Sequence, residues 1–316
     1  MKVLKSQENL PREWAQTAVS IGNFDGVHRG HVAILQRLRS TGLPTVVFTF
    51  EPHPMQLLCP LSAPERLTWT ERKLELLERQ NVDAVVLWQT TTEMLRWTAV
   101  EFFERILRRQ LHATSIVEGS TFTFGRNREG TPERLKALCQ TQGLTLEIVG
   151  SQMAQGEAIS SSRIRRILRE GNVQLANAML TEPYRIRGRI VSGEGRGRKI
   201  GFPTANLAEI DTLLPAYGVY AGRAILADGR TFQAAVNLGP NLTFGEETPK
   251  VEIHLLDFSE DLYGQELQVE FHTHLRDLTP FSSPEALVAQ IQQDVAAVRR
   301  SLENPSAATG HHQPSV

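Results

Sequence analysis

The first half of the chain alternates between short apolar runs and segments with helical spacing. Five β-prone apolar runs are predicted as strands, at 17–21, 44–50, 82–88, 113–119 and 144–150. Apolar residues at three- and four-residue spacing predict helices at 71–80, 100–110 and 132–140. Strands that alternate with helices form a parallel sheet covered on both faces, so we expect an N-terminal doubly wound α/β domain.

The pattern changes near residue 184. Pro183 ends the helical periodicity, and strand-like alternation follows in five runs, at 184–193, 219–226, 230–238, 250–258 and 266–275. Consecutive strands without intervening helices predict an antiparallel β-barrel, and helical spacing returns at 283–302. We therefore expect two domains, 1–183 and 184–302, followed by a tail at 303–316 that lacks periodicity and is predicted to be disordered.

Length and composition agree with this division. The chain has 316 residues, enough for two hydrophobic cores. Its net charge of −1 argues against nucleic-acid binding driven by bulk charge, and no apolar run is long enough to cross a bilayer. The N-terminal stretch lacks the apolar core of a signal peptide, and Cys59 and Cys139 form no CxxC pair. These features predict a cytoplasmic protein without nucleic-acid or membrane partners.

The stretch GNFDGVHRGH, at 22–31, follows the first predicted strand and precedes a helical pattern at 32–39. Glycines at such a turn let a ligand approach the backbone, and the free N–H groups of a helix start favour an anion. His28 and His31 are three residues apart, so one helical turn would direct both toward the same place. Such a pair alone is usually a capped helix start, and no third ligand at suitable spacing supports zinc. The whole run predicts a phosphate-sized anion site.

This run resembles the HxGH phosphate motif of nucleotidyltransferases. Its full form is similar to that of the prokaryotic bifunctional riboflavin kinase/FMN adenylyltransferase family. TFEPHP at 49–54 is similar to a family segment that forms a wall of the site, and SSSRIR at 160–165 resembles the second adenylyltransferase motif. A basic run at a helix start is usually solvated, yet its hydroxyls and arginines also suit a triphosphate. The resemblance implies nucleotide-binding roles for Asn23, Ser161, Ser162 and Arg163.

A glycine-rich basic segment, 193–207, lies in the predicted barrel. Its glycines miss the GxGxxG spacing, and such a loop is usually mobile and solvated, although it can also cradle phosphates. PTAN, at 203–206, resembles the nucleotide and magnesium motif of riboflavin kinases. The resemblance implies Mg²⁺ ligands and nucleotide contacts at Thr204, Asn206, Gly195 and Lys199.

VEIHLLDFSEDLYG, at 251–264, is similar to the family segment that carries the catalytic glutamate of the kinase. A glutamate in an alternating strand usually faces solvent, so it is the resemblance that implies Glu252 as the general base. A carboxylate in hydrogen-bond reach could accept the proton of a ribityl hydroxyl as that hydroxyl attacks phosphorus. Arg276 lies in a segment that resembles the flavin-side region of the family.

The resemblance extends from about residue 19 to residue 298 in one order. It implies that riboflavin and ATP give FMN and ADP in the barrel. FMN and ATP would then give FAD and pyrophosphate in the α/β domain, where the two histidines donate hydrogen bonds to the α-phosphate. Mg²⁺ is the implied metal, ATP is a co-substrate of both reactions, and the expected state is a monomer or weak homo-oligomer.

Three segments depart from the family pattern. Thr121 stands where the family usually has Asp, Asn241 with Leu242 stands where an Arg-Pro pair is common, and Thr181 with Glu182 replaces a usual Gly-Arg pair. One alternative is therefore a riboflavin kinase with an impaired adenylyltransferase domain. A nucleotidyltransferase for another phosphate substrate and a flavin-binding regulator without catalysis are further alternatives, against which PTAN and Glu252 argue.

Overall fold

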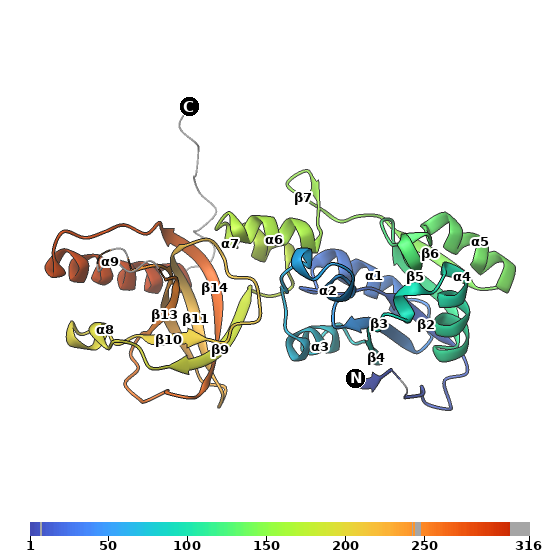
Figure 1. The fold of residues 1–316 in the computed structure, drawn as a ribbon, viewed down its shortest axis with the longest axis horizontal. Coiled ribbons are helices and arrows are strands. Elements are labelled where there is room, and N and C mark those ends of the chain that lie inside the picture. The colour runs from blue at the N-terminus through green and yellow to red at the C-terminus, as the bar shows by residue number, and fades with distance from the viewer. Residues whose placement is uncertain (7, 242, 244–247, 304–316) are drawn as a thin grey trace. The chain divides into compact units, whose positions relative to one another are not determined.

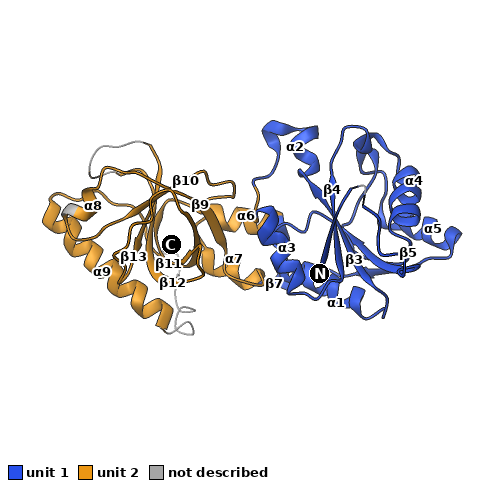
Figure 2. Cartoon of the chain, turned by 90° about the horizontal axis from the view of Figure 1, so that it is seen from below, with its two compact units in different colours: residues 1–65, 69–161 blue, residues 66–68, 162–316 orange. Residues whose placement is uncertain are grey.

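The computed structural model describes residues 1–6, 8–241, 243 and 248–303. They form two compact units, the first from residues 1–65 and 69–161 and the second from residues 66–68 and those after 161 (Figure 2). The predicted tail lies outside the described residues apart from Glu303, and so does Leu242. No helix in the described part of the chain is long and apolar enough to pass through a bilayer.

A six-stranded parallel sheet forms the centre of the first unit (Figure 1). Its strands are β1 (Lys2–Lys5), β2 (Thr17–Ile21), β3 (Thr45–Glu51), β4 (Ala84–Gln89), β5 (Ala113–Gly119) and β6 (Thr145–Val149). Their order is β1-β4-β3-β2-β5-β6, so the strand order reverses between β2 and β5, which confirms the predicted doubly wound sheet. The short edge strand β1 escapes prediction because only two of its four residues are apolar.

Helices cover both faces of this sheet, as the alternation predicts. One face is covered by α1 (Arg29–Arg39) and α3 (Thr70–Glu78), and the other by α4 (Ala99–Phe102), a π-helical segment (Phe103–Gln110) and α5 (Pro132–Gln142). The shorter elements are α2 (Pro54–Leu58), 3-10 turns at Pro60–Ser62, Met94–Arg96 and Arg126–Arg128, and the hairpin β7 (Met153–Ala154) with β8 (Glu157–Ala158). The helix predicted over 100–110 is thus one α-helical turn followed by a π-helical segment.

A closed antiparallel barrel forms the centre of the second unit. In their order around the barrel its strands are β10 (Ala205–Ala208), β13 (Lys250–Leu255), β12 (Thr231–Gly239), β11 (Gly218–Leu226), β14 (Glu266–Arg276) and β9 (Arg185–Val191). The helices of this unit are α6 (Ser161–Arg169), α7 (Val173–Met179), α8 (Arg196–Lys199) and α9 (Pro284–Glu303). Val298 and Leu302 of α9 pack with Ala221 and Leu256. The barrel and the final helix confirm the predicted fold of the second half.

The strand β10 is not predicted by the sequence pattern. It has only four residues and begins two residues after Pro203, so its local β-signal is weak. In the barrel it pairs with both β9 and β13, and Asn206 lies opposite Val191 on one side and Glu252 on the other. Tertiary pairing rather than local propensity therefore selects this strand.

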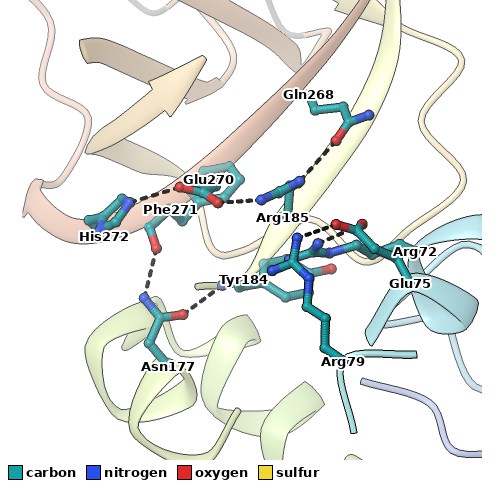
Figure 3. A network of polar contacts seen from close by, with 10 residues as sticks. All are labelled: Arg72, Glu75, Arg79, Asn177, Tyr184, Arg185, Gln268, Glu270, Phe271 and His272. Carbon is teal, nitrogen blue, oxygen red and sulfur yellow. Dashed lines mark hydrogen bonds and ion pairs between the residues drawn. The ribbon is translucent and has the colours of Figure 1, made fainter. Parts of the chain in front are cut away.

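Polar side chains join α7 to the barrel (Figure 3). Asn177 donates a hydrogen bond of 2.8 Å from Nδ2 to the carbonyl of Phe271 on β14. Its Oδ1 accepts a hydrogen bond of 2.8 Å from the N–H of Tyr184, just before β9. One amide thus satisfies two backbone groups, one on β14 and one just before β9, and fixes α7 against the barrel.

A buried ion pair joins β9 to β14 in the same view. Arg185 lies 2.6 Å from Glu270 and donates to Gln268 at 3.1 Å, and the ring of His272 is 3.3 Å from the carboxylate (Figure 3). Burial alone would raise the pKa of Glu270, but the hydrogen bonds from His272 and Arg185 lower that pKa to about 2.

We expect this pair to make the stability of the barrel pH-dependent. Because the folded pKa of Glu270 lies below the unfolded value of about 4.5, its contribution is complete above pH 4.5 and is lost as the pH falls toward 2. The difference corresponds to about 3 kcal/mol, so Glu270→Gln is expected to lower the free energy of unfolding at pH 7 by about that amount. Urea unfolding across this pH range measures the free energy of unfolding of the wild type and of the variant. The exposed Glu266→Gln, on the same strand, is the control, and equal pH dependence in both variants would contradict the assignment.

Candidate active sites

The turn after β2 brings the two predicted histidines together. His28 is the N-cap of α1, and its Nδ1 accepts a hydrogen bond of 3.3 Å from the N–H of His31. The two rings stack with their centroids 3.7 Å apart and an interplanar angle of 15°. A Cβ at Gly30 would lie 3.0 Å from the ring of His28, so the glycine between the histidines permits this arrangement. Since Nδ1 of His28 accepts, its Nε2 is left as the donor in the neutral ring.

Two buried polar atoms lie at this turn. Oδ1 of Asn23 and Nδ1 of His31 are shielded from solvent, and neither has a hydrogen-bond partner among the described residues. Burial holds the pKa of His31 well below its usual value of 6.5. His31 is therefore neutral at pH 7. Buried polar atoms normally have partners, so both atoms are candidates for contacts with a bound ligand.

Side chains from β3 and α3 form hydrogen bonds with the backbone of the same turn. The hydroxyl of Thr49 donates to the carbonyl of Asn23 at 3.1 Å, and Nζ of Lys73 lies 3.5 Å from that carbonyl and 3.3 Å from the Thr49 hydroxyl. Lys73 is only 6% exposed, which is rare for a lysine. Nothing in the helical pattern around Lys73 distinguishes it from a surface lysine, so the sequence alone does not reveal it.

The other residues predicted for this site lie on neighbouring segments. The hydroxyl of Ser161 donates to the carbonyl of Asp25 at 2.9 Å, which ties the start of α6 to the histidine turn. Ser162 and the largely buried Arg163 follow in the first turn of α6. His53, in the predicted wall segment, caps α2 by accepting the N–H of Met55 at 3.1 Å.

The barrel places Glu252 between two asparagines. Glu252 on β13 is paired with Asn206 of β10 on one side and with Asn237 of β12 on the other. Nδ2 of Asn237 lies 3.4 Å from Oε2 of Glu252, a long hydrogen bond that orients the carboxylate. Sequence reasoning misses Asn237 because only the strand register brings it to this position.

Two cavities share Thr204, and Glu252 lines the smaller of them. One, of about 450 Å³, is lined by Arg198, Thr204, Phe258, Glu260, Asp261 and Tyr263 among others. The other, of about 200 Å³, is more apolar, and its lining includes Phe202, Thr204, Glu252, Arg276, Phe281 and Ile291. A hydroxyl at the junction of two cavities can contact groups bound in either of them.

The glycine-rich segment lies beside the predicted metal ligands. A Cβ on Gly193 would overlap the side-chain amide of Asn206, and one on Gly197 would lie 3.3 Å from the hydroxyl of Thr204. Gly195 precedes α8 with a φ of 65°, a conformation that favours glycine. Lys199 is the last residue of α8, and its side chain is not among those described.

His254 is a further residue that the sequence does not single out. It lies two residues after Glu252 on β13 and lines the smaller cavity. Its Nδ1 is 2.8 Å from the carbonyl of Pro203, and since a carbonyl only accepts, Nδ1 carries the proton. The ring also meets Phe202 edge-on at 5.5 Å. His254 thereby fixes the backbone that leads into Thr204.

Arg276 lies in the wall of the smaller cavity and is held by α9. Its guanidinium makes two hydrogen bonds to the carboxylate of Asp294, with Nε 3.0 Å from Oδ1 and an Nη 2.8 Å from Oδ2. It also lies over the ring of Phe281, 5.6 Å from the centroid. The pair fixes α9 against the end of β14, so Arg276 shapes the cavity with its charge already paired.

The histidine turn on a parallel sheet and the carboxylate of Glu252 in a barrel are two candidate centres for phosphate chemistry in one enzyme. Family models agree with this division: the FAD synthetase model matches residues 10–163 and the riboflavin kinase model matches residues 180–302. The chain belongs to the bifunctional riboflavin kinase/FMN adenylyltransferase family. Membership confirms both predicted activities and their products, FMN and FAD, and favours them over the kinase-only alternative.

The relatives match nearly the full length of the chain. The bifunctional riboflavin kinase/FMN adenylyltransferase of Pseudomonas fluorescens is 37% identical over 312 residues, which cover 97% of this chain and 99% of the relative. The protein of the same name from Haemophilus influenzae is 35% identical over 303 residues, which cover 95% and 98%. A crystal structure called a macrolide-efflux protein from Streptococcus pneumoniae has a TM-score of 0.83 at 30% identity and covers 95% of this chain and 99% of that one.

Proposed function

We propose that FAD forms at the turn after β2, where Asn23, His28 and His31 bind the nucleotide. The buried, unpartnered Oδ1 of Asn23 and Nδ1 of His31 carry this proposal. An oxygen of the FMN phosphate attacks the α-phosphorus of ATP, the bond to the bridging oxygen of the β-phosphate breaks, and pyrophosphate leaves. The FMN phosphate is ionised near neutral pH, so the reaction needs no general base.

The two histidines act as neutral hydrogen-bond donors in this reaction. Each neutral ring carries one N–H, and in His28 that proton is on Nε2 because its Nδ1 accepts from His31. Donors fixed in place before the reaction stabilise the charge that develops on the α-phosphate oxygens. Ser161, Ser162 and Arg163 bind the β- and γ-phosphates, supported by their place at the start of α6 and by the family motif.

We propose that FMN forms in the barrel, with Glu252 as the general base. Its carboxylate, oriented by Asn237, accepts the proton of the terminal ribityl hydroxyl while that oxygen attacks the γ-phosphorus of ATP and ADP leaves. The apolar cavity with Phe202 and Phe281 suits the flavin ring, and the larger cavity suits ATP. Thr204 borders both cavities, where the transferred phosphate must pass.

The neutral side-chain oxygens of Thr204 and Asn206 would lie where the transferred phosphate passes. Such oxygens suit Mg²⁺, which prefers oxygen ligands and keeps several waters. Thr204 and Asn206 would hold the ion, and Gly193 and Gly197 let the backbone approach these two side chains closely. When bound, Mg²⁺ neutralises charge on the phosphates of ATP. Gly195 and Lys199 would contact the nucleotide phosphates, and Arg276 would shape the flavin side of the site.

The adenylyltransferase domain would comprise residues 1–183 and the kinase domain residues 184–302. The two free cysteines, one exposed and one buried, are consistent with a reducing cytoplasm. A monomer or weak homo-oligomer is the proposed state.

The assignment of Thr204 is tested by a magnesium titration. We expect Thr204→Ala to raise the Mg²⁺ concentration that half-saturates FMN formation by about 10- to 100-fold, because one oxygen ligand is lost. Flavins are separated by chromatography over time, with riboflavin and ATP as substrates. The exposed Thr231→Ala is the matched control, and FAD formation from added FMN should keep its Mg²⁺ requirement in both variants. An unchanged requirement for FMN formation in Thr204→Ala would exclude Thr204 as a ligand.

A further inference from the structure

Glu118 is a buried acid that neither proposed reaction uses. It lies near the carboxyl end of β5 and is 2% exposed. By the alternation along β5 it shares a face with Ile116, which belongs to the apolar cluster beneath α4 and α5. A carboxyl group is costly to bury in such surroundings, whereas an apolar side chain would pack there without penalty.

The hydrogen bond of Glu118 lies where two central strands separate. β2 pairs with β5 from Thr17 to Val19, but it pairs with β3 as far as Ile21. The next N–H along the chain, that of Gly22, donates to Phe48 of β3 at 3.0 Å. Successive N–H groups of a strand point to opposite sides, so the N–H of Ile21 faces β5. Oε1 of Glu118 accepts it at 2.6 Å, and a side chain thus replaces the backbone ladder.

This separation lies at the functional edge of the sheet. The strand order reverses between β2 and β5, and ligands of open α/β sheets bind in the crevice at such a reversal. Ile21 is two residues before Asn23 and ends the strand that leads into the histidine turn. The position of the Ile21 peptide therefore affects the placement of the groups that would bind the nucleotide.

Burial disfavours the charged form of this carboxyl group. It raises the pKa of Glu118 well above its usual value, and the hydrogen bond from Ile21 opposes that shift only in part. An oxygen of the group accepts the peptide N–H in either protonation state, so its effect on the Ile21 peptide depends on the hydrogen bond and not on a charge.

We propose that Glu118 is a positioning residue for FAD formation. It holds the Ile21 peptide, keeps the crevice between β2 and β5 open, and thereby fixes Asn23 and the histidine pair for catalysis. This inference rests on the proposed site of FAD formation at the turn after β2.

Two substitutions of similar length separate this role from simple packing. Glu118→Gln keeps an oxygen that accepts the Ile21 N–H, whereas Glu118→Met fills the space with a side chain that accepts only weakly. We expect the Gln variant to keep kcat for FAD formation within about threefold. We expect the Met variant to lose about tenfold in kcat, since a buried N–H is left unsatisfied, with little change in KM for FMN.

Full-length protein is assayed with FMN and ATP, and FMN formation from riboflavin in the same sample is the internal control. Wild-type kcat in the folded Met variant, or equal loss in both variants, would overturn the proposal. Near-UV circular dichroism shows whether the Met variant is folded. If it is unfolded, the Gln variant alone tests the proposal, because a tenfold loss of kcat in the Gln variant would also overturn the proposal. His28→Ala separates the two hypotheses: if it retains FAD formation, the site assignment fails rather than the role of Glu118.

Discussion

Replacing Glu252 with Gln is expected to lower the rate of FMN formation by about 10²- to 10⁴-fold, the usual contribution of a general base. The amide has nearly the shape of the carboxylate, and it can still accept the hydrogen bond from Asn237. It cannot accept the proton of the ribityl hydroxyl, which is a poor nucleophile while protonated. The loss is therefore expected in kcat, with small changes in KM for riboflavin and ATP.

The second activity of the same chain supplies the internal control. FAD formation from added FMN should be unchanged in Glu252→Gln, because Glu252 belongs to the barrel unit and the histidine turn to the other. The exposed Glu209→Gln, next to β10, should leave both activities unchanged. FMN formation within tenfold of the wild-type rate in Glu252→Gln would exclude Glu252 as the base.

The sequence predicts the central strands of both units because their apolar runs are long and bounded by turn residues. The run over 113–119 becomes β5 without a change at either end. Among the strands that escape prediction, β1 and β10 are four residues long and depend on pairing partners that are distant in sequence. Their hydrogen bonds, rather than their own propensity, place them in the sheet and in the barrel.

The candidate sites show the same limit. The histidine turn is visible in the sequence because its glycines and histidines are adjacent, and the structure stacks the two rings. Asn237, His254 and Glu118 are not visible in the sequence, because their hydrogen-bond partners lie far along the chain: Glu252, Pro203 and Ile21, respectively. Motifs reveal groups that are neighbours along the chain, whereas the residues that orient them come from neighbouring strands.

His28→Ala is expected to lower kcat for FAD formation by about 10²- to 10³-fold, the usual loss when one donor to a developing negative charge is removed. His28 is 6% exposed, caps α1 and stacks on His31, so its Nε2–H is held in place before ATP binds. The substitution also removes the acceptor of the His31 N–H, which loosens the second donor. FAD formation from added FMN and ATP, followed by chromatography, measures the loss.

A matched histidine in the same unit controls for loss of an imidazole. His112 is exposed and follows the π-helical segment, so His112→Ala should leave FAD formation at the wild-type rate. FMN formation should be unchanged in both variants, because its proposed base lies on β13 of the barrel. Under conditions where riboflavin is the only flavin supplied, His28→Ala should therefore accumulate FMN while FAD stays low. Equal loss of both activities would contradict the two-site assignment, since one substitution at the turn after β2 would then have disabled the barrel as well.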